Sequence, residues 1–114
     1  MKVLIVDDEP DICFFIEYEI KENGNETFTA NDGLEALEIL KNNPDIEIII
    51  SDVKMPKMDG IEFLKESQLI NNKIKKFIFI TGFSDLDEDK AKSLGAFALL
   101  PKPIQLDDLL KQID

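Results

Sequence analysis

The sequence predicts an α/β protein in which five parallel strands form one sheet and helices cover both of its faces. Five short apolar runs alternate with five amphipathic segments along the 114 residues. The runs are almost continuously apolar, which is typical of strands that are buried on both faces. Apolar residues make up 44% of the chain, enough for a globular core. Because crossovers between parallel strands are right-handed, these features indicate a doubly wound, three-layer sandwich.

The first strand is expected over Lys2–Val6. The helix after it begins at Pro10, since proline is favourable at the first helical position, and Gly24 is a suitable cap for its C-terminal end. A weaker strand is expected over Glu26–Ala30, where apolar residues alternate only loosely. The first quarter of the chain therefore predicts one strand–helix–strand unit.

The second helix is expected between the turn at residues 31–33 and Pro44, because the residue before a proline disfavours the helical conformation. Three of its leucines share one face and are expected to pack on the sheet. The third strand is expected over Ile46–Ser51. The three leucines are Leu34, Leu37 and Leu40.

Asp59 is the expected N-cap of the third helix, with Glu62 three residues later as in an acidic capping box. The fourth strand is expected over Lys76–Ile80. The fourth helix, from about Asp85 to Leu94, has acidic first turns that suit the helix dipole but few residues that can bury apolar area. Gly95 ends it. The fifth strand is then expected over Ala96–Leu100, and the last helix carries Leu106, Leu109, Leu110 and Ile113.

The charge and residue content exclude several classes of function. The chain has 13 lysines, no arginine and 24 acidic residues, so its net charge of −11 repels nucleic acid and anionic lipid. Without histidine it cannot form a Ser-His-Asp, Cys-His or HExxH zinc site. Its single cysteine, Cys13, is expected to be a buried, inert thiol.

Two further expectations concern location and domain count. No apolar stretch approaches the ~20 residues that span a membrane, and the first strand begins too early to leave room for a signal peptide. A cytoplasmic location is therefore expected. The length and the absence of a linker predict one domain over residues 1–114.

Polar side chains follow four of the predicted strands at the point where each strand ends. Asp7 and Asp8 follow the first strand, Asp52 the third, Thr81 the fourth and Lys102 the fifth. Each alone has an ordinary explanation, as a solvated loop acid, a turn residue or an exposed lysine. Together they would meet at the carboxyl edge of the sheet, which is where open parallel sheets bind ligands.

This combination of side chains suits phosphoryl chemistry. Three clustered carboxylates repel one another unless a cation joins them, and Mg²⁺ prefers such oxygen ligands. One carboxylate can attack phosphorus and form an acyl phosphate. The ammonium and hydroxyl groups can then neutralise the phosphoryl oxygens.

The chain resembles the receiver domains of response regulators in two-component signalling, over essentially its whole length. Each of the motifs is weak alone, but all of them occur in the family's order and at family-like spacing. The resemblance implies a flavodoxin-like fold with strand order 2-1-3-4-5. The motifs are residues 4–10 (Leu-Ile-Val-Asp-Asp-Glu-Pro), residues 52–56 (Asp-Val-Lys-Met-Pro) with Asp59-Gly60, Thr81-Gly82, Gly95-Ala96 and Lys102-Pro103.

The resemblance also implies a role for each site residue. Asp52 matches the phosphoryl acceptor, Thr81 the hydroxyl that turns toward the phosphoryl group, and Lys102 the lysine that pairs with it. The bond between Lys102 and Pro103 is expected to be cis. The implied Mg²⁺ ligands are Asp7, Asp8, Asp52 and the backbone carbonyl of Lys54.

One position distinguishes this chain within the family. Receivers often have Tyr or Phe three residues before the lysine, as a switch coupled to the threonine, whereas this chain has Leu99. Phe83 and Lys54 match positions that flank the acyl phosphate. The bulk of Phe83 is expected to hinder the water that hydrolyses it.

The resemblance implies a phosphoprotein that takes its phosphoryl group from a histidine kinase or a phosphotransfer protein. The donor must act in trans, because this chain has no histidine. Beyond self-phosphorylation from small acyl phosphates and self-dephosphorylation, no enzyme activity is expected. The output is a conformational change on the face of the fourth helix, fifth strand and fifth helix, directed to an output protein that the sequence does not identify. A monomer or weak dimer is expected.

Four alternatives stay open at this point. The chain could be a degenerate receiver that only binds proteins, or the receiver part of a multidomain transcriptional regulator. A flavodoxin-like flavin protein would need a glycine- and hydroxyl-rich phosphate loop after the first strand, where Asp7-Asp8-Glu9 would repel the flavin phosphate. A phosphatase with an aspartate nucleophile usually has a second acid two residues later, where this chain has Lys54.

Overall fold

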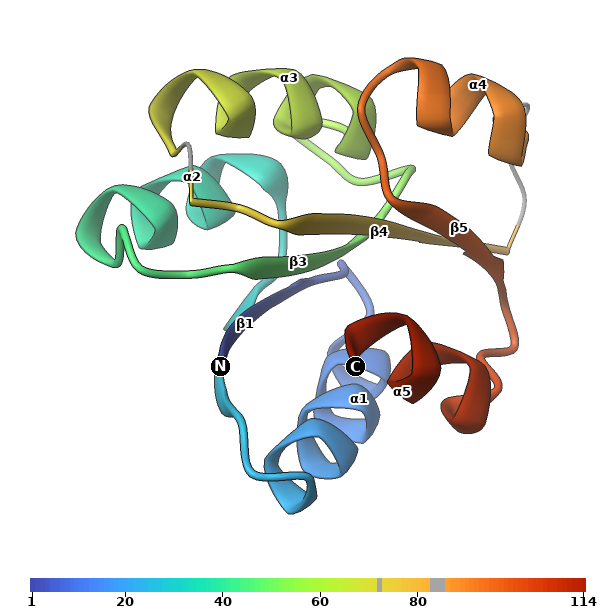
Figure 1. Cartoon of the computed structure of the whole chain (residues 1–114). Coiled ribbons are helices and arrows are strands. Elements are labelled where there is room, and N and C mark those ends of the chain that lie inside the picture. The colour runs from blue at the N-terminus through green and yellow to red at the C-terminus, as the bar shows by residue number, and fades with distance from the viewer. Residues whose placement is uncertain (72, 83–85) are drawn as a thin grey trace.

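The computed structural model describes residues 1–71, 73–82 and 86–114. Strands and helices alternate along these residues, beginning with a strand (Figure 1). No helix in the described part of the chain is long and apolar enough to cross a bilayer. The strands are β1 (Lys2–Val6), β2 (Glu26–Ala30), β3 (Ile48–Asp52), β4 (Lys76–Thr81) and β5 (Ala98–Pro101). The helices are α1 (Pro10–Glu22), α2 (Gly33–Asn42), α3 (Gly60–Ile70), α4 (Glu88–Ser93) and α5 (Leu106–Ile113).

The five strands form one parallel sheet in the order β2-β1-β3-β4-β5, which confirms the predicted fold class and strand order. The register brings the carboxyl ends of the strands to one edge: Val6 pairs with Ala30 and with Ser51, and Thr81 pairs with Pro101. All side chains that follow a strand therefore leave the sheet at the same edge.

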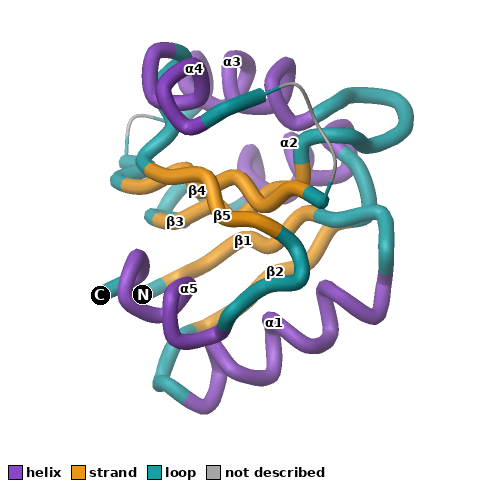
Figure 2. The backbone as a smooth tube through the Cα atoms, turned by 90° about the vertical axis from the view of Figure 1, so that its right-hand side faces the viewer, coloured by secondary structure: helices purple, strands orange, loops and turns teal. Residues whose placement is uncertain are grey.

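Two helical layers enclose the sheet, α2, α3 and α4 on one face and α1 and α5 on the other (Figures 1 and 2). The core on the first face contains three packed aromatic rings: Phe77 lies 5.6 Å from Phe63 and 5.1 Å from Phe79, measured between ring centroids. The core on the second face is mostly isoleucine from β1, β3, β4 and α1. Burial of these side chains from water is the main force that fixes the sheet between the layers.

Several strand boundaries differ from the sequence prediction. β3 begins at Ile48, where pairing with Val3 starts, although the preceding Ile46 is already buried. β5 begins at Ala98, not Ala96, because the residues before it still close the turn after α4. β3, β4 and β5 each run one residue further than expected, since Asp52 still pairs with Ile80, and Thr81 with Pro101.

The prediction for the fourth helix was wrong at its start. The helix begins at Glu88, because the Asp87 side chain accepts a hydrogen bond from the Lys90 N–H (2.8 Å) and acts as its N-cap. Leu34 was also misassigned to the buried face of α2, since its side chain is 48% exposed. Phe83 and Asp85, to which the sequence gave roles, lie outside the described residues.

Candidate functional site

Four of the predicted site residues lie together at the carboxyl edge of the sheet. Asp52 and Thr81 are the last residues of β3 and β4, Asp7 follows β1, and Lys102 follows β5. The Asp7 N–H donates to the Ala30 carbonyl (3.1 Å), and the Lys102 N–H donates to the Thr81 carbonyl (2.8 Å). These bonds fix both residues to a neighbouring strand, so their side chains start from defined positions.

Three carboxylates meet at this edge. One ligand oxygen each from Asp7, Asp8 and Asp52 lies within 4.8 Å of the other two. Asp7 is fully buried and Asp52 is buried, whereas Asp8 is exposed. The cluster is therefore closed toward the sheet and open toward solvent on the Asp8 side. A cation or an anionic group could enter from that side.

Lys102 forms ion pairs with two of these acids and with Glu9. Its Nζ atom lies 3.0 Å from an oxygen of Asp7 and 3.0 Å from an oxygen of Asp52, and 3.3 Å from Glu9. Burial alone would lower the pKa of Lys102, but its interactions with Asp7 and Asp52 outweigh this and raise the pKa. The lysine is therefore a fixed positive charge at neutral pH, as a partner for phosphoryl oxygens must be.

Asp7 is the acid whose charge is least well compensated. Its Oδ1 accepts a hydrogen bond from the Glu9 N–H (2.9 Å). Its Oδ2 is buried and has no hydrogen bond of good geometry to any described residue, although the Lys102 ammonium is close. Burial raises the pKa of Asp7, and the nearby Asp52 charge adds to this, while the Glu9 N–H and Lys102 oppose it.

The arrangement fits Mg²⁺. The buried Oδ2 of Asp7 has only the Lys102 ammonium beside it among the described residues, so it can serve as a ligand, and two more carboxylates lie within reach of the same ion. Mg²⁺ typically takes few carboxylates and completes its octahedron with waters and substrate oxygens. Asp7, Asp8 and Asp52 are therefore the side chains that would hold it.

The loop after β3 carries the fourth predicted ligand. Lys54 lies in this loop with its side chain exposed, two residues after Asp52. The Asp52 Oδ1 accepts a hydrogen bond from the Val53 N–H (2.7 Å), and the Gly60 N–H returns to the Val53 carbonyl (2.7 Å). A Cβ atom at Gly60 would overlap the Asp52 carbonyl oxygen, so only glycine lets α3 begin this close to Asp52. The carbonyl role of Lys54 stays a prediction.

Leu99 occupies the position where the family often has the aromatic switch residue, and it packs into the core. Leu99 pairs with Phe79 in the sheet register, is half-buried, and packs against the aromatic side of the core. Thr81 is also half-buried, at the end of the neighbouring strand. The described structure therefore places an aliphatic side chain, without a polar end, where the family often has tyrosine.

The cysteine is structural, as expected. Cys13 is 5% exposed, and its Sγ lies 3.4 Å from the Asp7 carbonyl oxygen. Burial raises the pKa of its thiol to about 11, and the Asp7 charge adds to this shift. A thiol of that pKa is a poor nucleophile at neutral pH.

One residue of the site was given no role by the sequence. Glu9 contacts Lys102 across the site, yet the motif containing it predicted only the acid pair before it. The available signal was its position, between the acid pair and Pro10 at the start of a helix. The bond between Lys102 and Pro103 is cis, as the resemblance implied.

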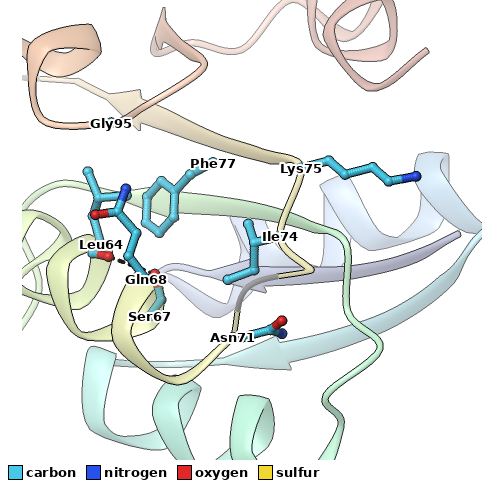
Figure 3. A pocket seen from close by; sticks show the side chains of 8 residues that line it. All are labelled: Leu64, Ser67, Gln68, Asn71, Ile74, Lys75, Phe77 and Gly95. Atoms are coloured by element: carbon cyan, nitrogen blue, oxygen red, sulfur yellow. Dashed lines mark hydrogen bonds between the residues drawn. The ribbon is translucent and has the colours of Figure 1, made fainter.

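A separate cavity of about 190 Å³ lies at the opposite edge of the sheet, near the start of β4 (Figure 3). Two of its polar side chains already have backbone partners: Ser67 donates to the Leu64 carbonyl (2.8 Å) and Asn71 to the Ile46 carbonyl (3.4 Å). Among the described residues that line it, the only charged one is Lys75. The carboxyl edge is therefore the better candidate for chemistry. The lining residues are Leu64, Ser67, Gln68, Asn71, Ile74, Lys75, Phe77 and Gly95.

Several known proteins are similar to this chain in sequence. Sporulation initiation phosphotransferase F of Bacillus subtilis is 38% identical over 110 residues, which are 95% of this chain and 86% of that protein. The next relatives are transcriptional regulatory proteins, and the chain spans about half of their length (48% and 55%).

Solved structures agree. A receiver domain protein from Clostridium thermocellum is 38% identical, with a TM-score of 0.90 over 98% of this chain and 90% of that one. CheX–CheY–BeF₃–Mg²⁺ from Borrelia burgdorferi also reaches 0.90, at 29% identity, over 99% of this chain and 86% of that one. The family model of the response regulator receiver domain matches residues 3–114. The chain thus belongs to the response regulator receiver domain family.

Proposed function

We propose that this receiver accepts a phosphoryl group on Asp52, in a Mg²⁺-dependent step, from a histidine kinase or a phosphotransfer protein. Phosphoryl acceptance is the general function of the family. One observation carries the assignment to this site: the Asp52 carboxylate lies 3.0 Å from the Lys102 ammonium and shares a cluster with Asp7 and Asp8.

The transfer needs a nucleophile and charges that neutralise the phosphoryl oxygens. An Asp52 oxygen attacks the phosphorus of a phosphohistidine on the donor, the P–O bond forms and the P–N bond breaks, and the departing imidazole takes a proton from solvent. Lys102 pairs with a phosphoryl oxygen as a point charge, and the Thr81 hydroxyl donates to another. Mg²⁺, when bound, supplies the remaining positive charge.

A protein donor is supported by the surface beside the site. A groove of about 360 Å³ lies between α1 and the loop after β5, and Lys102 itself is part of its lining. The groove continues along α1 to large exposed apolar side chains, of which Phe14 is 72% and Tyr18 57% exposed. Exposed apolar area next to a reactive group favours contact with a protein rather than with a small molecule alone. The groove residues are Asp11, Ile12, Phe15, Lys102, Pro103 and Ile104.

The proposed output is a change on the face formed by α4, β5 and α5. α4 has six residues and buries only Ala91, so little packing energy holds it in one position. Weakly packed segments are the ones that shift population when a site nearby changes. We expect amide exchange in α4 to slow on phosphorylation, measured by hydrogen–deuterium exchange, with α3 as the internal control. Unchanged protection in α4 would contradict this output face.

A second reading keeps the fold and the chemistry but changes the context. The similarity to transcriptional regulators of about twice the matched length favours a receiver that controls a further domain. A receiver that only binds proteins is less well supported, because it would have no use for an acid cluster paired to a half-buried lysine. In each reading we propose no enzyme activity beyond self-phosphorylation and self-dephosphorylation.

Intact mass after incubation with Mg²⁺ and a small acyl phosphate tests the proposed function. We expect the wild type to gain the mass of one phosphoryl group, and to gain none without Mg²⁺. Asp52→Asn should gain none, whereas Asp107→Asn, an exposed acid on α5, should react as the wild type does. A phosphoryl group that stays on Asp52→Asn would show that another residue is the acceptor.

A further inference from the structure

Glu9 occupies a helix-capping position without capping the helix. It is the N-cap residue of α1, directly before Pro10, but its side chain makes no capping hydrogen bond. Caps of this kind usually use the short side chains of Ser, Thr, Asp or Asn. The Glu9 backbone is fixed, because its N–H donates to Asp7 Oδ1 (2.9 Å). The side chain is therefore held at the mouth of the site and is available for another contact.

That contact is with Lys102, at 3.3 Å between Glu9 Oε2 and Nζ. Lys102 thus faces three carboxylates, and its ammonium has three protons to donate. The three partners differ in exposure: the side chain of Asp7 is 0% exposed, that of Asp52 10% and that of Glu9 60%. Because water screens exposed pairs, the pair with Glu9 is the weakest of the three.

We propose that Glu9 is a displaceable counter-ion of Lys102, which gives up the ammonium when a phosphoryl group arrives and slows the approach of small anionic phosphodonors until then. This inference rests on the proposed function, since it assumes that Asp52 is the acceptor. Glu9 is a positioning residue: it touches Lys102 and acts on the reaction through that lysine and through its own charge.

The physical reason is a competition for one cation. A phosphoryl group on Asp52 needs the Lys102 ammonium, whose charge is shared among three carboxylates within 3.3 Å. Asp7 is buried and cannot turn to water, whereas Glu9 can, so Glu9 is the partner that yields. Before that happens, its exposed negative charge lies 3.3 Å from the Lys102 ammonium, where it repels an approaching dianionic donor.

The test compares Glu9→Gln with the wild type, using a small acyl phosphate as donor and Mg²⁺ at saturation. One negative charge about 6–8 Å from a dianion in water corresponds to a rate difference of about threefold to tenfold. We expect Glu9→Gln to react faster by that factor at low ionic strength. The advantage should shrink as salt is added, because salt screens the repulsion.

Two controls separate charge from a general effect on the protein. Glu66→Gln removes one negative charge from an exposed position on α3 and should leave the rate unchanged. Glu9→Asp keeps the charge and should keep the wild-type salt dependence. Glu9 is exposed, so both variants at this position should fold, which melting curves would verify.

A second measurement does not depend on turnover. Binding of beryllofluoride with Mg²⁺, followed by ¹⁹F NMR, should be tighter by about threefold in Glu9→Gln than in the wild type. Equal rates, equal salt dependence and equal beryllofluoride affinity would overturn the role of Glu9 while the proposed function stands. A wild type that neither gains a phosphoryl group nor binds beryllofluoride would overturn the proposed function, and this inference with it.

Discussion

The two edges of the sheet treat their buried polar groups in opposite ways. At the edge where β4 begins, Asn71 and Ser67 donate to backbone carbonyls, and the Lys76 ammonium lies 2.6 Å from the Gln112 carbonyl oxygen. At the carboxyl edge, Asp7 keeps a buried oxygen without a good hydrogen bond, and one lysine serves several acids. At the first edge the chain itself supplies hydrogen-bond partners for these polar groups. At the second edge it leaves Asp7 Oδ2 without one among the described residues.

The difference indicates what each edge contributes. Buried polar groups with partners stabilise a fold modestly, whereas buried groups without partners cost free energy unless something else supplies the missing contact. In the proposed function a cation and a phosphoryl group bind at the carboxyl edge, and these would supply that contact. Groups left unsatisfied by the folded chain are therefore expected to mark the functional edge.

Removal of the Lys102 side chain should have the largest effect on the free energy of unfolding, because it would leave more buried charge without a partner at the carboxyl edge. Lys102→Ala leaves Asp7 and Asp52 without their cation, and loss of one partner of a buried ion pair costs about 3 kcal/mol of the free energy of unfolding. Denaturant titration measures it, with Lys111→Ala on exposed α5 as the control. Equal stability of Lys102→Ala and the wild type would mean that the acids need no compensation.

Cys13 allows a comparison within the carboxyl edge, because its buried thiol is neutral at pH 7 whereas the nearby acids are charged. Its thiol pKa rises from 9.0 to about 11 on folding. Between these values the unfolded chain loses the proton while the folded chain keeps it, so stability falls as pH rises above 9. The loss should approach about 2–3 kcal/mol near pH 11.

Stability of the wild type and of Cys13→Ala, measured from pH 7 to pH 11, isolates this group from the other groups that titrate there. The difference between the two proteins should change with pH only above about 9. A constant difference over the whole range would show that the thiol is not perturbed by burial.

At the opposite edge, Asn71→Ala should cost about 1–2 kcal/mol of the free energy of unfolding. It removes the donor to the Ile46 carbonyl and the acceptor of the Lys73 N–H (2.8 Å). Thermal or denaturant unfolding measures the loss, and Asn42→Ala, at an exposed position, should show none. Because this edge takes no part in the chemistry, the phosphorylation rate of Asn71→Ala should equal that of the wild type. A slower rate would link the two edges.

Much of the site could be predicted because strand ends impose its geometry. Asp7, Asp52 and Lys102 directly follow apolar runs, and parallel strands bring such positions to one edge. The contact from Glu9 could not be predicted in this way, because a long side chain can turn toward several neighbours and spacing does not select one. The start of α4 was missed for a related reason, since several acids in succession could each have capped it, and the one whose side chain does so is Asp87.

Leu34 shows the limit of periodicity. Spacing placed it with Leu37 and Leu40, but an apolar stripe is wider than the contact that a sheet makes with one helix, and Leu34 lies at its exposed margin. The strand order, by contrast, was correct, because the motifs that identified the family also fix its topology.

The most direct test of the contrast between the edges is the response of the melting temperature to Mg²⁺ in the wild type and in Asp7→Asn. If the unsatisfied acid is kept for the cation, the wild type should melt several degrees higher with saturating Mg²⁺, because a ligand that binds only the folded state stabilises it. Asp7→Asn should be more stable than the wild type without Mg²⁺, by about 1 kcal/mol, and should respond little to it. Equal Mg²⁺ responses, or an Asp7→Asn protein that is less stable without the ion, would contradict this explanation.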